Sequence, residues 1–165
     1  MIAAISHRVG QFWRHSAGRV SPTELDEAER ILGTLMPLFS ALPQNEQRHG
    51  LDVLQTVRGQ GGSDRLLLQA ALLHDMGKAE ARVSVIERSL AVFLGAVFPA
   101  GLKAWRRLLP TFGRRYAAYL DHAALGARRL AAEGAQELAA VVREHHDRDA
   151  KLEQTRRLRE ADGSN

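Results

Sequence analysis

The chain has 165 residues, a mass of 18.2 kDa and a formal net charge of +4 at neutral pH. Hydrophobic residues make up 45% of it and charged residues 25%, a balance that excludes fibrous and largely disordered proteins. The chain contains no cysteine, which excludes disulfides, thiolate nucleophiles and cysteine-bound metals, so any metal must be held by imidazole and carboxylate groups.

The first 42 residues are predicted to form an N-terminal helical extension. One helix is expected over Ile2–Gly18. A second begins at Ser21-Pro22-Thr23-Glu24, where Ser21 is a suitable N-cap, proline occupies the first helical position and a glutamate follows three residues after the cap. This helix is expected to run to about Ser40, bent or interrupted near Pro37. The extension is expected to pack on the core as a helical pair. An oligomer contact and contact of a basic amphipathic helix with a membrane surface are the alternatives.

Residues 43–165 are expected to form one all-α domain, because Ala, Leu, Arg and Glu dominate and β-branched alternation is absent. A glycine-rich loop at residues 59–62 precedes a helix that Ser63 or Asp64 can cap. The Leu66–Leu73 run is nearly all apolar, which indicates a buried helix, and Gly77 is expected to end it in the left-handed conformation. The predicted helices of this domain are Gln44–Arg58, Arg65–Met76, Arg82–Phe98, Leu102–Leu109, Phe112–Ala132, Ala135–His146 and Leu152–Ala161.

The sequence favours a cytoplasmic protein without a transmembrane segment. The most apolar stretch, Val83 to Phe98, is interrupted by charged residues and is shorter than the roughly 20 residues that a bilayer span needs. The absence of cysteine is consistent with a reducing compartment. The basic balance suggests anionic partners, but no zinc-finger, RRM or KH signature is present, so specific nucleic-acid binding is not expected.

Five of the seven histidines fall where the predicted helices are apolar. A single histidine in such a place is more often a hydrogen-bonded core residue than a ligand. Several buried imidazoles with a carboxylate are costly without partners, however, and convergence on a divalent cation removes that cost. The cluster therefore predicts a metal site. Its histidines are His49, His74, His122, His145 and His146.

The run Leu72-Leu73-His74-Asp75-Met76-Gly77-Lys78 resembles the signature of the HD superfamily of metal-dependent phosphohydrolases, two hydrophobic residues followed by His-Asp-x-Gly-Lys. Four further elements occur in the family's order. They are Arg48-His49, which is similar to the first ligand histidine, His122 to Ala127, which resembles a His-x-x-x-Gly-Ala segment, His145-His146-Asp147, which resembles a paired-histidine segment, and Ala161-Asp162, which resembles a closing Ala-Asp. The resemblance covers about Gln47 to Asn165.

Membership in this family would imply a compact all-helical bundle that binds divalent metals such as iron or manganese. The resemblance assigns the first metal to His49, His74, Asp75 and Asp162. It assigns a second metal to His122, His145 and His146, with Asp75 as the bridging carboxylate. The expected cofactor is therefore a pair of divalent ions.

The activity that this implies is hydrolysis of a phosphate ester or anhydride, with a nucleotide or dinucleotide as the expected small phosphorylated substrate. A metal-activated hydroxide would attack phosphorus, and the ions would stabilise the developing charge. Asp75, as the bridging ligand, and Lys78, as a fixed positive charge beside the phosphate, are the expected catalytic residues. The alternatives are a non-catalytic regulatory or nucleotide-binding module of HD type and a di-iron oxygenase.

Two departures from the family's patterns narrow this prediction. Members that degrade cyclic di-GMP carry a Gly-Tyr-Pro element after the paired histidines, where this chain has Arg148-Asp149-Ala150-Lys151. Some trinuclear members have a glutamate four residues before the first histidine, where this chain has Asn45. Neither cyclic di-GMP as substrate nor a third metal is therefore expected.

For several other polar residues, the sequence leaves open whether they belong to the site or face solvent. Asp121 either orients His122 or faces solvent, and Asp147 or Asp149 could replace Asp162 if the last helix docks differently. Glu144 is expected to face solvent, and His7 and His15 are assigned no chemistry. Five arginines either grip a polyphosphate or simply face solvent, the latter being favoured. They are Arg82, Arg106, Arg107, Arg114 and Arg115.

Overall fold

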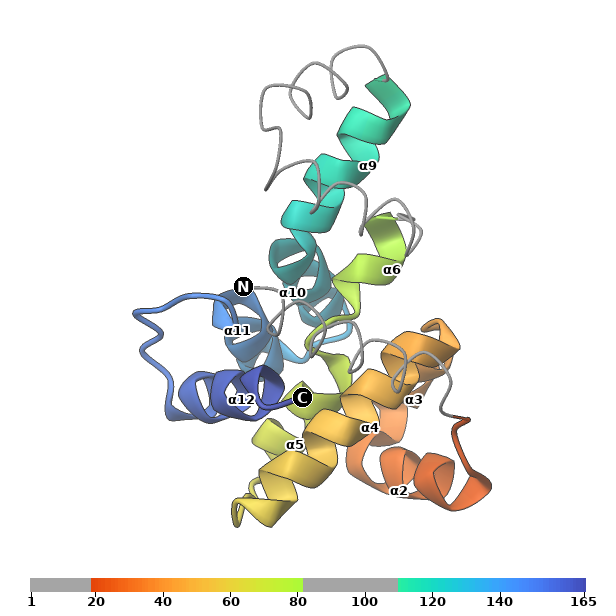
Figure 1. Cartoon of the computed structure of the whole chain (residues 1–165), viewed down its shortest axis with the longest axis vertical. Coiled ribbons are helices and arrows are strands. Elements are labelled where there is room, and N and C mark those ends of the chain that lie inside the picture. The colour runs from red at the N-terminus through yellow and green to blue at the C-terminus, as the bar shows by residue number, and fades with distance from the viewer. Residues whose placement is uncertain (1–18, 82–109) are drawn as a thin grey trace, which may run out of the picture.

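The computed structural model describes residues 19–81 and 110–165, and every regular element within these ranges is helical (Figure 1). This confirms the predicted all-α fold class. None of the described helices is long and apolar enough to cross a membrane. The elements are α2 (Pro22–Leu32), the 3₁₀ turn η1 (Gly33–Leu35), α3 (Met36–Ser40), α4 (Gln44–Gly59), α5 (Arg65–Leu73), α6 (Gly77–Ala81), α9 (Pro110–Leu120), α10 (His122–Ala132), α11 (Gln136–Glu144) and α12 (Glu153–Gly163).

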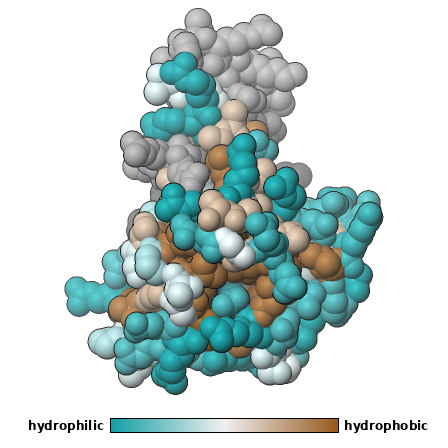
Figure 2. Space-filling view, turned by 180° about the vertical axis from the view of Figure 1, so that it is seen from behind, coloured by the Kyte–Doolittle hydropathy of each residue, from teal (hydrophilic) through white to brown (hydrophobic). Residues whose placement is uncertain are grey.

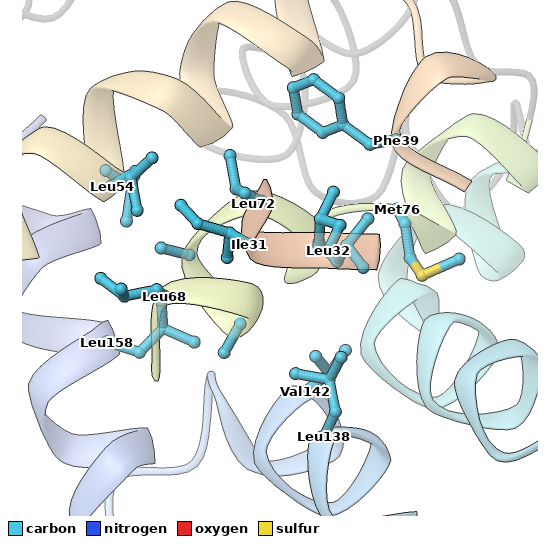
Figure 3. Packing of buried hydrophobic residues seen from close by; sticks show 14 of the residues in the cluster. Ile31, Leu32, Phe39, Leu54, Leu68, Leu72, Met76, Leu138, Val142 and Leu158 are labelled. Carbon is cyan, nitrogen blue, oxygen red and sulfur yellow. The ribbon is translucent and has the colours of Figure 1, made fainter. Parts of the chain in front are cut away.

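Helix α5 lies at the centre of the core and contacts α2, α3, α4, α11 and α12. Its residues from Leu67 to Leu73 are buried except for Gln69, as the apolar run predicted. Figure 3 shows the side chains that surround it, which come from elements far apart in the sequence: Ile31 and Leu32 of α2, Leu138 and Val142 of α11, and Leu158 of α12. The chain therefore leaves α5 with its C-terminal end enclosed by protein, and this is where His74 and Asp75 follow.

The beginning of α2 forms as predicted. The hydroxyl of Ser21 accepts from the backbone N–H of Glu24, and the Glu24 carboxylate accepts from the backbone N–H of Ser21, which completes a capping box. The bend or interruption expected near Pro37 is an interruption, and it lies before that residue. The helix stops earlier, at Gly33, where φ is +57°, a value that glycine adopts at little cost, and Pro37 then lies in the first turn of α3.

Two further expectations about helix ends are wrong. Gly77 does not end α5 in the left-handed conformation, because α5 stops at Leu73 and Gly77 begins α6 with no positive φ. The helix predicted over Phe112–Ala132 is two helices, α9 and α10, divided at Asp121. The break turns the chain so that His122 becomes the first residue of α10.

Helices α6, α9 and α10 contact one another to one side of the core, and α10 packs closely on α11 (Figure 1). On the face shown in Figure 2 hydrophilic residues dominate, with apolar residues visible in the middle of the described part. The helices predicted over Ile2–Gly18, Arg82–Phe98 and Leu102–Leu109 lie outside the described residues. The described part of the N-terminal extension contributes Ala28, Leu32 and Phe39 to the same hydrophobic core as the remaining helices.

Candidate metal centre

The structure brings all seven predicted ligand residues into one cluster. His49 comes from α4 and Asp162 from the last turns of α12, while His74 and Asp75 directly follow α5. His122 opens α10, and His145 and His146 directly follow α11. The residues form two groups, and within each group the ligand atoms lie within 4.8 Å of one another. One group is His49, His74 and Asp162, and the other is Asp75, His122, His145 and His146. Each group has the residue types to hold a metal ion.

The first group surrounds one oxygen of Asp75. The Asp75 Oδ2 atom lies 3.5 Å from His49 Nε2 and 3.5 Å from His74 Nε2. The Oδ1 atom of Asp162 lies 3.0 Å from His49 Nε2 and 3.6 Å from His74 Nε2. Ligand atoms about 2.1 Å from a common ion stand about 3.0–3.4 Å apart, so these separations suit a shared divalent cation.

The second group surrounds the other oxygen of the same carboxylate. The Oδ1 atom of Asp75 lies 3.3 Å from His122 Nε2 and 3.8 Å from His145 Nε2. The Nε2 atoms of His122 and His146 are 3.0 Å apart. Because two imidazole lone pairs repel at that distance, either a proton or a cation must lie between them. Asp75 thus presents one oxygen to each group, which is the arrangement of a bridging carboxylate.

Backbone carbonyls fix three of the imidazoles. The Nδ1 atoms of His74, His122 and His145 lie 3.0, 2.8 and 2.6 Å from the carbonyl oxygens of Ala71, Tyr119 and Val142. A carbonyl can only accept a hydrogen bond, so each Nδ1 must carry the proton. In the neutral ring this leaves the lone pair on Nε2, the atom that faces the centre, and metal-binding histidines are oriented in this way.

Three atoms of the cluster are buried and have no hydrogen-bond partner among the described residues. They are His74 Nε2, Asp75 Oδ1 and His145 Nε2. A buried polar atom without a partner costs on the order of 1–3 kcal/mol, and native proteins contain few of them. These are also the atoms that the two groups direct at their centres. The donor set therefore fits divalent cations, which would satisfy all three.

Electrostatics favour ionised carboxylates at this centre. Burial raises the pKa of Asp75, but the charges of His74 and Lys78 outweigh it and hold that pKa well below its usual range. Burial likewise raises the pKa of Asp162, and the neighbouring imidazoles of His49 and His74 outweigh it and lower that pKa. Both carboxylates are therefore available as anionic ligands at neutral pH.

The histidines and the lysine respond to those carboxylates in different ways. Burial lowers the pKa of His74, but Asp75 and Asp162 outweigh it and raise that pKa. Burial and the neighbouring His145 and His122 lower the pKa of His146 to about 4, so its imidazole is neutral at neutral pH, as a ligand must be. Lys78 donates to Asp75 Oδ2, and this carboxylate raises the lysine's pKa despite its burial, so the ammonium remains charged.

The residues of the centre differ in how far they are exposed to solvent. His74 and His145 are each 1% exposed, whereas the side chains of Lys78, His49 and Asp162 are 17%, 19% and 26% exposed, and His146 is an exposed residue. The cluster is therefore partly accessible to solvent at these four residues. The ammonium of Lys78 lies beside the Asp75 oxygen of the first group.

The structure decides between several interpretations that the sequence left open. Asp162, and not Asp147 or Asp149, contacts His49, while the latter two are exposed. Asp121 is also exposed, and the backbone carbonyl of Tyr119 takes the orienting role that Asp121 was a candidate for. The side chain of Glu144 accepts a hydrogen bond from the backbone N–H of Lys151. Of the candidate arginines, Arg114 is exposed, and Arg82, Arg106 and Arg107 lie outside the described residues.

Sequence reasoning missed the aromatic and acidic neighbours of the centre. The ring of Tyr119 stacks on that of His122, with centroids 5.9 Å apart, and Tyr116 stacks on Tyr119 at 6.2 Å. The spacing of three residues was a readable signal, because residues three apart would share one face of the single helix predicted over Phe112–Ala132. Glu46 is buried near Lys78, and its charge also raises the lysine's pKa.

Comparisons with protein-family models, with curated proteins and with solved structures found no match to this chain. The chemical character of the centre follows from its own geometry. It offers five imidazoles and two carboxylates in two adjoining groups, a carboxylate shared between them and an ammonium in contact with that carboxylate. Such buried groups can hold metal ions.

Proposed function

We propose that the chain is a metal-dependent phosphohydrolase of HD type that cleaves a phosphate ester or anhydride of a small substrate such as a nucleotide. The observation that carries this proposal is the set of buried ligand atoms without partners, His74 Nε2, Asp75 Oδ1 and His145 Nε2, directed into a cluster that an ammonium borders. The resemblance of residues 72–78 to the His-Asp-x-Gly-Lys motif supports it further.

Two divalent cations would be held by His49, His74 and Asp162 on one side and by His122, His145 and His146 on the other, with Asp75 between them. Bound there, they would supply the positive charge that activates water and neutralises phosphate oxygens. The ligand set mixes nitrogen and oxygen donors, which suits iron, manganese or similar ions.

The chain's own residues prepare the site for an anionic substrate. The carbonyls of Ala71, Tyr119 and Val142 hold three imidazoles in one tautomer, so little reorganisation is needed when ligands bind. Lys78 keeps its charge at neutral pH and is partly exposed beside the centre, where its Nζ would bind a phosphoryl oxygen. Burial of His74 and His145 keeps these two imidazoles out of contact with solvent.

The test begins with the metal content of the purified full chain. Turnover is then measured on nucleotides, dinucleotides and simple phosphodiesters with added Mn²⁺ or Fe²⁺. We expect bound metal and phosphate release in the wild type, both greatly reduced in His74→Ala and unchanged in His15→Ala, a histidine outside the proposed set. Metal binding without turnover would support the regulatory alternative, and oxygen consumption with an alcohol substrate would support the oxygenase alternative. Full activity of His74→Ala would refute the site.

A further inference from the structure

Three consecutive residues of α4 contact three different neighbours. Arg48 Nη1 donates to Glu24 Oε1 of α2 at 2.6 Å. His49 Nε2 lies 3.0 Å from Asp162 Oδ1 within the candidate metal centre. Gly50 faces α5, where a Cβ at this position would stand 2.9 Å from the carbonyl oxygen of Leu72. The turn that carries His49 is therefore held from both sides, by an ion pair with α2 and by close backbone packing on α5.

The ion pair with α2 is unusually well fixed for a pair near the surface. The Arg48 guanidinium also donates through Nε to Asp52 Oδ1 at 2.9 Å, so its planar fork is held by two carboxylates at once. The other Glu24 oxygen, Oε2, accepts from the backbone N–H and the hydroxyl of Ser21 at 2.9 and 2.8 Å. Glu24 is thus immobilised by the helix start before it meets Arg48.

We infer that Glu24 is a positioning residue for the metal centre, acting through Arg48 to set the rotation of the α4 turn that presents His49. The N-terminal extension, which lies outside the stretch that carries the family resemblance, thereby acquires a role. It rests on the proposed function only in requiring that His49 bind a metal ion. Turnover is not needed to test it.

A second ion pair between the same two helices provides a matched control. Arg58, also of α4, pairs with Glu27 of α2. It lies ten residues beyond Arg48, which corresponds to about 15 Å along a helix. If the ion pairs only tie α2 to α4, removing either should have the same effect. If Glu24 positions His49, only its removal should change metal binding.

The experiment titrates the metal-free full chain with Mn²⁺ and with Co²⁺, whose visible spectrum reports its coordination, in the wild type, E24Q and E27Q. Loss of a group that orients a metal ligand typically weakens binding 10–100-fold. We expect E24Q to weaken one metal-binding step about tenfold and to alter the Co²⁺ spectrum. E27Q should keep the metal affinity within about twofold of the wild type and leave the Co²⁺ spectrum unchanged. E27Q and E24Q should nevertheless lower the thermal midpoint of the metal-free chain by similar amounts.

A third arm tests whether the effect passes through Arg48. We expect R48Q to weaken the same step as E24Q and the double variant E24Q/R48Q to be no worse than R48Q alone, because residues that act through one contact are not additive. R48K, which keeps the charge but loses the planar fork, serves as the second variant if E24Q fails to fold. Circular dichroism checks the fold in each case.

Equal weakening by E24Q and E27Q, no weakening by E24Q, or additive losses in the double variant would each overturn the inference. A wild-type chain that binds neither ion would overturn both this inference and the proposed function. A wild-type chain that binds metal but releases no phosphate would overturn the proposed function alone, and the positioning role of Glu24 would then still be decided by the titration.

Discussion

Gly77 lies directly against the backbone carbonyl of His122. A Cβ at position 77 would stand 2.0 Å from that oxygen and 2.8 Å from the backbone nitrogen of Gly126. The turn after Asp75 and the first turn of α10 therefore meet backbone to backbone, and only a residue without a side chain permits this approach. The same contact brings His122 Nε2 to 3.3 Å from Asp75 Oδ1.

Gly77→Ala should therefore damage both stability and the metal centre. Overpacking of a tight contact costs about 1–3 kcal/mol, and here the obstacle is backbone, which cannot rotate away. We expect at least that loss in the free energy of unfolding, measured by urea denaturation, together with weaker metal binding. Gly59→Ala is the control, because nothing lies within 4 Å of a Cβ there. Equal stability of the two variants would contradict the packing argument.

Asp162→Asn should lower metal affinity by tenfold or more. The substitution removes the negative charge that lies 3.0 Å from His49 Nε2 and 3.6 Å from His74 Nε2. Metal content after dialysis, measured by elemental analysis, is the readout. Asp149→Asn removes the same charge from an exposed residue and should leave the metal content unchanged. If the Asp149 variant loses metal instead, the last ligand is Asp149, in the loop between α11 and α12, and not Asp162.

Lys78→Met should separate substrate binding from metal binding. Removal of a fixed positive charge beside a reacting group typically lowers turnover on the order of 10²–10³-fold. We expect a fall of this size in phosphate release, with both ions still bound, since Lys78 donates no lone pair to a metal. Lys151→Met, at an exposed position, is the matched control. If the Lys78 variant loses its metal as well, the lysine supports the ligands rather than the substrate.

Glu24 should make stability depend on acid pH. Burial raises its pKa, but hydrogen bonds from Ser21 and the pairing with Arg48 outweigh this and lower it from 4.5 to about 2. Because the folded pKa is depressed, the stabilising contribution is complete above pH 4.5 and is lost as the pH falls toward 2. The difference in unfolding free energy between the metal-free wild type and E24Q should therefore be largest above pH 5 and shrink below pH 4.5. Urea denaturation from pH 6 to pH 3 measures it, and a constant difference would refute it.

Features that depend on a few neighbouring residues could be predicted from the sequence. The capping box at Ser21 joins residues three apart, and Asp64 caps α5 by accepting from Leu66 two residues later. The burial of α5 followed from its nearly continuous apolar run. The types of residue at the centre were also readable, because no cysteine competes with histidine and aspartate as a ligand.

What depends on distant segments could not be predicted in this way. The sequence indicated a helix end at Gly77, whereas the residue is glycine because α10 packs against it. It left Asp147, Asp149 and Asp162 as alternatives, and only the docking of α12 beside α4 and α5 selects Asp162. The division of the two Asp75 oxygens between two groups of imidazoles also arises from packing. Local hydrogen bonds are encoded within one or two turns of chain, but the distance between two side chains on separate helices is fixed only when those helices pack.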